Sequence, residues 1–201
     1  MDALARTIAS LERNRIKAHR VHDKLAAKDL VLSMISKSDV VGAGGSTTLE
    51  QCGIIDAMAN YNFLDWFVPG IELQKKFDLR RQTLVCDVFL SSANAVTEDG
   101  KIVNIDGGGN RVAAMLYGPK KVILVVGKNK ITKNLDDAID RVRNVAAPLN
   151  CKRLNKNTPC VETGRCSDCS SPDRICSSLV ILEAQQLERI SVIIVDEELG
   201  F

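Results

Sequence analysis

The stretch that decides the fold is DVVGAGGSTTLEQCGII, which occupies residues 39–55. Its apolar residues Val40 to Ala43 predict a short buried strand. A glycine-rich turn follows, and the hydroxyl residues Ser46 and Thr47 are typical N-caps, so we expect a helix to begin there. A strand, a tight turn and a helix in this order form the repeating unit of α/β domains.

The same alternation continues along the chain. We expect further strands at residues 84–90, 121–126, 179–182 and 191–195, a hairpin at 95–105, and helices at 77–83, 110–117 and 134–146, the last ended by Pro148. Short apolar strands alternating with helices predict an α/β fold with a mostly parallel sheet flanked by helices. Ligands of such sheets bind in the loops at the carboxyl ends of the strands.

The N-terminal segment 1–37 is expected to be helical, with Asp29 capping a second helix. His19 and His22 would then lie three residues apart on a solvated helix face rather than hold a metal. The whole chain of 201 residues is expected to form one domain.

The composition excludes several classes of protein. The formal net charge of +2 argues against a nucleic-acid carrier driven by bulk charge. The longest apolar runs are too short to span a bilayer, and the N-terminus carries no pattern of a secretion signal. We therefore expect a cytoplasmic protein that binds neither membrane nor nucleic acid.

Two glycine loops carry the chemistry of an anion or polar-ligand site. Residues 44–48 place backbone N–H groups and hydroxyls at a helix start. No lysine follows these glycines as in a Walker loop, and no G-x-G-x-x-G follows the strand. A purely structural turn capped by Ser46 is the alternative. The second loop, residues 94–111, is crowded with polar side chains and contains three successive glycines, and residues 127–130 could bring a cation to the same sheet edge.

Seven cysteines are the unusual feature of the composition. Four follow the spacing Cys160-x5-Cys166-x2-Cys169-x6-Cys176 within a polar stretch, which we interpret as a Cys-rich metal-binding insert at residues 150–177 near the C-terminus. Four thiolates complete a Zn²⁺ shell or hold a [4Fe–4S] cluster, and the irregular spacing favours the iron–sulfur cluster over zinc. A disulfide, a redox C-x-x-C pair and free thiols remain alternatives. Cys151 is interpreted as spare, and Cys52 and Cys86 as buried packing residues.

The whole pattern resembles the LUD domain, a family named for lactate utilisation. The resemblance rests on the segments GGSTTL (44–49), NAVTEDG (94–100), GNRVAA (109–114), GPKKV (118–122) and VGKNKI (126–131), together with the spacing of the four cysteines.

This resemblance implies a fold similar to ribose-5-phosphate isomerase, glucosamine-6-phosphate deaminase and the CoA transferases. It implies an anion at residues 44–48 and, by position only, acids in the second loop. The candidate catalytic residues are Glu98, Asp99 and Asp106. The candidate ligand-binding residues are Gly44, Gly45, Ser46, Thr47, Thr48, Asn94, Thr97, Asn104, Gly108, Gly109, Asn110, Arg111, Asn129 and Lys130.

The function expected from the resemblance is support of the oxidation of lactate or a related 2-hydroxy acid, with the cluster carrying electrons. The alternatives are an enzyme that acts on a small phosphorylated or carboxylated sugar-like substrate, with a structural metal, and a ligand-binding or scaffold module. The expected partners are a small carboxylate or phosphate and a redox partner subunit, because a lone cluster cannot oxidise lactate. The sequence does not decide whether the chain forms a homo-oligomer.

Overall fold

The central feature of the computed structural model, which describes residues 2–201, is a parallel sheet of six strands. The strand order is β1 (Lys17–Val21), β10 (Ile190–Val195), β7 (Lys121–Gly127), β4 (Val88–Ser91), β2 (Val40–Ala43) and β3 (Asn62–Phe63). Every neighbouring pair is parallel, which confirms the predicted α/β fold with a mostly parallel sheet. β7 and β10 are central and almost wholly buried, as expected for a sheet covered on both faces.

A second, smaller sheet was not anticipated. It has the order β8 (Ile131–Thr132), β5 (Ala95–Thr97), β6 (Ile102–Asp106) and β9 (Ser178–Leu182). β5 and β6 form the predicted antiparallel hairpin, and β9 pairs with β6 rather than with the main sheet. The returning chain after the Cys-rich segment therefore enters the small sheet first and the main sheet only at β10.

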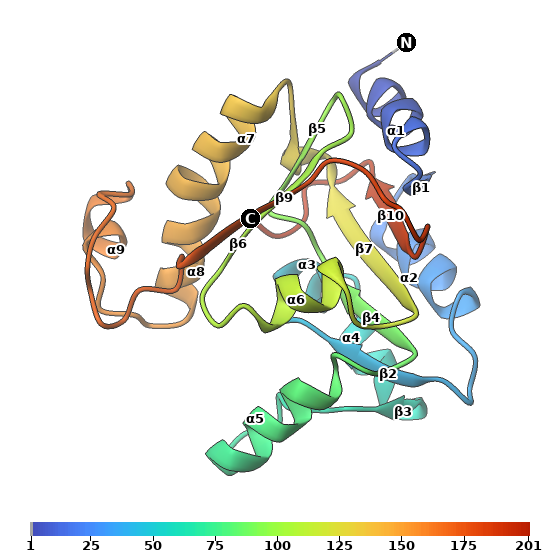
Figure 1. The fold of residues 1–201 in the computed structure, drawn as a ribbon, viewed down its shortest axis with the longest axis horizontal. Helices are drawn as coiled ribbons and strands as arrows, with labels where there is room; N and C mark the ends of the chain where they lie inside the picture. The colour runs from blue at the N-terminus through green and yellow to red at the C-terminus, as the bar shows by residue number, and fades with distance from the viewer. Residues whose placement is uncertain (1) are drawn as a thin grey trace.

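Helices cover both sheets, as Figure 1 shows. They are α1 (Ala3–Arg13), α2 (Lys24–Ser33), α3 (Thr47–Gln51), α4 (Ile54–Ala57), η1 (Met58–Asn60), α5 (Leu73–Gln82), α6 (Asn110–Leu116), η2 (Lys128–Lys130), α7 (Leu135–Arg141), the π-helix η3 (Val142–Ala146), α8 (Ala147–Arg153) and α9 (Pro159–Thr163). Within residues 2–201 no helix is long and apolar enough to cross a membrane.

Three apolar clusters define the layers. One face of the main sheet packs on α2, α3 and α4 through residues such as Val31, Leu49 and Ile54. The other face packs on α1, α6 and the small sheet. The outer face of the small sheet packs on α7, η3 and α8 through Ala138 and Val142. Each fully buried aliphatic side chain contributes about 1.5–3 kcal/mol relative to exposure.

The N-terminal prediction was wrong in one element. Residues 17–21 form β1, an edge strand parallel to β10, so the segment 1–37 is helix, strand, helix. His19 lies on that strand and His22 just after it, so neither lies on a helix face. The second helix begins earlier than predicted, because Asp23 and not Asp29 accepts the capping hydrogen bond, from the N–H of Ala26 at 2.8 Å.

Pro148 does not end the helix that begins after Asn134. The chain continues from α7 through η3 into α8, and Pro148 stands in the first turn of α8. A proline is tolerated there because the preceding π turn shifts the hydrogen-bond ladder and the first-turn N–H groups need no partner in the same ladder. The predicted insert at 150–177 therefore begins inside a helix.

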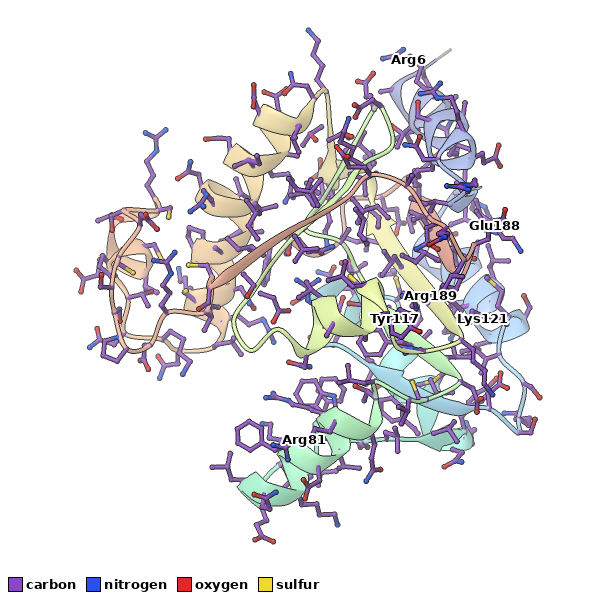
Figure 2. All side chains as sticks on the ribbon, in the orientation of Figure 1. Arg6, Arg81, Tyr117, Lys121, Glu188 and Arg189 are labelled. Atoms are coloured by element: carbon purple, nitrogen blue, oxygen red, sulfur yellow. The ribbon has the colours of Figure 1, made fainter. Side chains whose placement is uncertain are left out.

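Arg189 ties the start of β10 to the end of α6. Its guanidinium donates hydrogen bonds to the carbonyls of Ala114 and Pro119, and Figure 2 shows its side chain next to Tyr117. A cation at a helix C-terminus satisfies carbonyls that have no partner within the helix.

Candidate functional site

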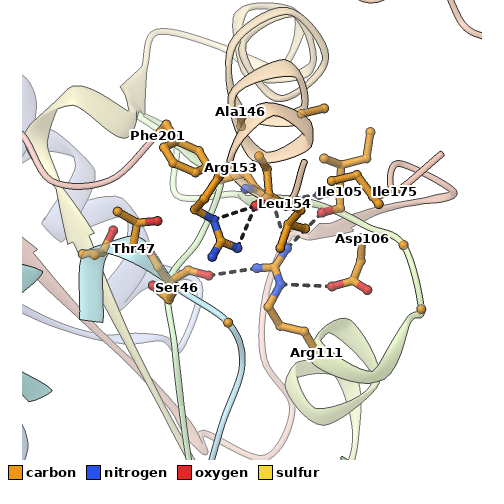
Figure 3. A pocket seen from close by; sticks show the side chains of 18 of the residues that line it. Ser46, Thr47, Ile105, Asp106, Arg111, Ala146, Arg153, Leu154, Ile175 and Phe201 are labelled. Carbon is orange, nitrogen blue, oxygen red and sulfur yellow. Dashed lines mark hydrogen bonds and ion pairs between the residues drawn. The ribbon is translucent and has the colours of Figure 1, made fainter. Parts of the chain in front are cut away.

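A cavity of about 650 Å³ lies at the carboxyl ends of β2, β4 and β7. Residues 45–48 follow β2, residues 92–94 follow β4, and Lys130 follows β7. This is the edge at which parallel sheets bind ligands. Figure 3 shows Ser46 and Thr47 at one side of the cavity and Asp106 and Arg111 at the other.

The structure brings ten of the seventeen predicted catalytic and ligand-binding residues to this cavity. They are Gly45, Ser46, Thr47, Thr48, Asn94, Asp106, Gly108, Asn110, Arg111 and Lys130. The other seven do not line it, and they are Gly44, Thr97, Glu98, Asp99, Asn104, Gly109 and Asn129.

The hydroxyl turn after β2 has one unused polar group. Ser46 caps α3, because its Oγ accepts the N–H of Leu49 at 3.3 Å. The Thr47 Oγ1 is buried and has no hydrogen-bond partner among the described residues. A buried hydroxyl without a partner costs roughly 1–3 kcal/mol. A ligand in the cavity that Thr47 lines would remove that cost.

Lys130 is a buried amine at the floor of the cavity. Its side chain is 3% exposed, and its Nζ donates hydrogen bonds to Thr48 Oγ1 at 2.8 Å and Ser92 Oγ at 3.0 Å. No carboxylate forms an ion pair with it among residues 2–201. Lysine is seldom buried without such a partner.

Burial lowers the pKa of Lys130 to about 7. The guanidinium groups of Arg141 and Arg111 act in the same direction, because a nearby positive charge disfavours a second one. Amines with a lowered pKa are typical of functional sites.

Arg111 holds the second loop together. Its guanidinium has five N–H donors, and five acceptors of the protein take them. They are Asp106 Oδ2, Ser92 O, Asn104 Oδ1, Asn94 Oδ1 and Ile105 O, at 2.8–3.0 Å. Arg111 was predicted to bind ligand, but its donors are all engaged within the fold. It therefore positions Asn94 and Asp106 at the cavity.

Gly44, although outside the cavity, makes that arrangement sterically feasible. A Cβ at this position would lie 2.9 Å from the Cγ and Cδ of Arg111. Asn104 accepts from Arg111, and Gly109 donates its N–H to Asp106 Oδ1 at 2.7 Å. Gly44, Asn104 and Gly109 therefore hold Arg111 and Asp106 in position without lining the cavity themselves.

Of the three candidate catalytic acids, only Asp106 lines the cavity. Glu98 and Asp99 lie at the hairpin turn, where Glu98 pairs with Arg6 of α1 at 2.7 Å and Asp99 pairs with Lys101. Thr97 bonds to Asp99 in the same turn. Asn129 is likewise occupied elsewhere, because its Oδ1 accepts the N–H of Leu199 at 3.0 Å.

The sequence did not single out a group of basic and aromatic residues that α5, α8 and their neighbouring loops bring to the cavity. Six basic and two acidic residues line it, and four of the basic ones were missed: Lys76, Arg80, Arg153 and Lys156. Arg80 lies 4.2 Å over the ring of Trp66, and its buried Nε has no partner among the described residues. The spacing of Lys76 and Arg80, one helical turn apart, was a signal, but only the fold shows what they face.

The Cys-rich segment lies beside the cavity. Ile175 lines the cavity, and so do Asn150 and Arg153 on α8, which flank Cys151. The thiols of Cys160, Cys166, Cys169 and Cys176 are free and half-buried. Within residues 2–201 no three Cys, His, Asp or Glu side chains converge closely enough to hold a metal ion. The metal-binding character of the insert therefore stays a prediction.

Cys151 lies on α8, next to the Cys-rich segment. It is 1% exposed, burial raises the pKa of its thiol, and the neighbouring thiols of Cys160 and Cys176 act in the same direction. Cys52 and Cys86 are each 3% exposed, which confirms that they are packing residues. Burial raises the pKa of each of these two thiols to about 11, so neither is a thiolate at neutral pH.

In the comparison with known families, the LUD domain matches residues 4–195. The match spans nearly the whole chain. The chain belongs to the LUD domain family. None of the curated proteins compared with this LUD domain matches it.

Solved structures support the fold of this LUD domain. A DUF162 family protein from Deinococcus radiodurans has a TM-score of 0.57 at 14% identity, with 96% of each chain covered, which shows a shared fold. Ribose 5 phosphate isomerase A from Neisseria gonorrhoeae has a TM-score of 0.35 at 12% identity, covering 56% of this chain and 54% of the isomerase, which is too low to support an argument.

Proposed function

We propose that this LUD domain binds a small carboxylate or phosphate in the cavity and supports the oxidation of lactate or a related 2-hydroxy acid. The observation that carries the proposal is the buried Lys130 beside the Ser46–Thr48 turn, in a cavity with six basic and two acidic lining residues. Membership of a family named for lactate utilisation supports the choice of substrate class.

Basic side chains on α5 and α8 would bind the negatively charged group of the ligand. Arg80 offers an Nε without a partner, and a guanidinium binds a carboxylate or phosphate through paired N–H donors. Arg153 extends into the same space, although part of its guanidinium donates to Asn150 Oδ1 at 2.8 Å. The Thr47 hydroxyl, which also lines the cavity, is a further donor.

The test is calorimetric titration of the full chain with lactate, pyruvate and inorganic phosphate at constant ionic strength. The variant is Arg80→Gln, and the matched control is Arg81→Gln, which changes the adjacent residue of α5 outside the cavity (Figure 2). Losing a charge-assisted hydrogen bond of about 1.5–3 kcal/mol predicts an affinity at least tenfold lower for Arg80→Gln. No binding to the wild type, or equal losses in both variants, would contradict the proposal.

The proposed cofactor is a [4Fe–4S] cluster on Cys160, Cys166, Cys169 and Cys176, with Zn²⁺ as the alternative. Four thiols in one segment are the right donor chemistry, and the Asp168 N–H donates to Cys166 Sγ at 3.4 Å, a contact that favours a thiolate. The four sulfurs do not converge in this geometry. When bound, such a cluster supplies single-electron transfer.

Iron, sulfide and zinc contents and the visible spectrum of anaerobically purified protein test the cofactor. We expect iron with equimolar sulfide and a brown colour, which Cys169→Ser abolishes and Cys86→Ala, a change in the core, leaves intact. Zinc at one ion per chain would establish the alternative. A colourless protein free of both metals would refute both. Oxidation of lactate would also require a redox partner subunit. Such a subunit would co-purify with the chain, and the pair would reduce an added electron acceptor when lactate is supplied.

A further inference from the structure

The environment of the Lys130 nitrogen is unusual in how its hydrogen-bonding positions are used. Thr48 Oγ1 donates its own hydrogen to the carbonyl of Leu199 at 3.3 Å, and Ser92 Oγ donates to the carbonyl of Ala93 at 3.2 Å. Both hydroxyls must therefore accept from Nζ. A neutral amine has two N–H groups and one lone pair, so both N–H groups are engaged and the lone pair remains.

The remaining position on Nζ has no partner among the described residues, and Lys130 lines the cavity. The charged and titratable groups that face the amine are Arg111 on α6, Arg141 on α7 and Cys52 at the end of α3. The two guanidinium groups disfavour an ammonium there, and no carboxylate among the described residues pairs with it. The fold thus presents a desolvated neutral amine to whatever occupies the cavity, which is how lysine nucleophiles are activated.

From this geometry we propose that Lys130 is a nucleophile that forms a Schiff base with the carbonyl group of a 2-oxo acid held in the cavity. The inference rests on the proposed function, because a 2-oxo acid is the oxidation product of a 2-hydroxy acid and carries the carboxylate that the basic residues would bind. The carbonyl next to that carboxylate is the electrophile that the amine needs.

The step balances without a co-reactant. The Nζ lone pair attacks the carbonyl carbon, and the carbonyl oxygen takes a proton to give a carbinolamine. The two hydrogens of the amine leave with that oxygen as water, and a C=N bond remains. The hydroxyls of Thr48 and Ser92 contact Nζ, so either can accept the proton from nitrogen and turn its own hydrogen from the backbone carbonyl to the substrate oxygen.

The test is reductive trapping on the full chain. Pyruvate and sodium cyanoborohydride are added at pH 7, and the adduct is measured by intact mass and peptide mapping. We expect one adduct per chain, heavier by one pyruvic acid less one oxygen atom, on Lys130. At pH 7 an amine with a pKa of about 7 has roughly a thousandfold the neutral fraction of an ordinary lysine with a pKa of ~10.4. Lys128, exposed and two residues away, is the internal comparison, and its labelling should be at least tenfold slower.

Two variants and a pH series sharpen the test. Lys130→Gln should give no adduct, whereas Lys128→Gln should keep the adduct on Lys130. The labelling rate at Lys130 should rise from pH 6 to pH 8 and then level. Labelling spread over surface lysines, or none at Lys130, would overturn the inference, and this result comes from the wild type whether or not a variant folds.

The failure of the inference is separable from that of the proposed function. Pyruvate that binds in calorimetry but leaves no adduct would refute the nucleophile and keep the anion site. Methyl pyruvate, which has no carboxylate, should label Lys130 at least tenfold more slowly than pyruvate. Equal rates would refute recognition of the carboxylate, and with it the assignment of a 2-oxo acid.

Discussion

The Nε of Arg111 donates a hydrogen bond to Asp106 Oδ2 at 3.0 Å, and the two side chains are only 12% and 10% exposed. This buried pair joins α6 to the end of β6 at the edge of the cavity. A buried pair of this kind costs much to desolvate, and removing one partner leaves the other charge uncompensated. The shape of the site therefore depends on the guanidinium of Arg111.

Arg111→Lys is expected to destabilise the fold by about 3–5 kcal/mol, because lysine cannot present five donors in one plane. Urea unfolding measures this loss. Arg81 is exposed and forms an ion pair with Asp78 at 3.0 Å, so Arg81→Lys should cost less than about 0.5 kcal/mol. A variant at position 111 with normal stability and no anion binding would instead show that Arg111 contacts the ligand itself.

Glu98→Gln and Asp99→Asn are expected to leave anion affinity within about twofold of wild type, since neither residue lines the cavity. Each change removes a partly exposed ion pair, so the loss of stability should be about 0.2–1 kcal/mol. Calorimetry and thermal unfolding on the same samples separate the two effects. If anion binding were lost while the melting temperature stayed unchanged, Glu98 or Asp99 would take part in binding the ligand.

The predictable part of the fold is the part with strong local patterns. The β2–α3 unit, the β5–β6 hairpin, β7 and β10 follow from apolar runs and turn residues, and Ser46 caps α3 as predicted. β1 was missed because Lys17–Val21 is a polar edge strand, whose only buried side chain is Ala18. Its strand character comes from pairing with β10, across more than 170 residues of sequence.

The candidate site was predictable where loops follow parallel strands. Thr48 and Lys130 meet because β2 and β7 end at the same edge, a consequence of topology. Arg80 could not be found this way, because α5 has no buried residue and its sequence shows no face turned toward a core. Figure 1 shows α5 projecting from the main body, and only its placement brings Arg80 over Trp66.

Gly100→Ala is expected to destabilise the hairpin turn more than Gly164→Ala destabilises the end of α9. Both glycines have positive φ, +86° and +70°, so both changes carry the cost of about 1 kcal/mol for that backbone region. A Cβ at Gly100 would also lie 2.7 Å from the Ser10 carbonyl carbon of α1, whereas nothing lies within 4 Å at Gly164. Overpacking adds about 1–3 kcal/mol, measurable as the difference between the two urea midpoints. Equal losses would show that α1 does not pack on the turn.

Lys130→Met is expected to stabilise the protein at neutral pH, and the gain should vanish as the pH rises. The pKa of Lys130 is lowered from 10.5 to about 7 in the folded state, so between these values the unfolded chain binds more protons than the folded one. Wild-type stability therefore rises with pH across this window, and the penalty is complete below pH 7. A shift of this size corresponds to a penalty of about 5 kcal/mol. Methionine has no charge to desolvate, so the difference in unfolding free energy between variant and wild type should be largest at pH 6–7 and near zero by pH 10.5.

Urea unfolding of both proteins from pH 6 to pH 10.5 gives this difference directly, because the contributions of titratable groups common to both proteins cancel. A constant difference would mean that Lys130 is an ammonium in the folded protein at neutral pH, and the amine would then serve as a fixed positive charge for the anion.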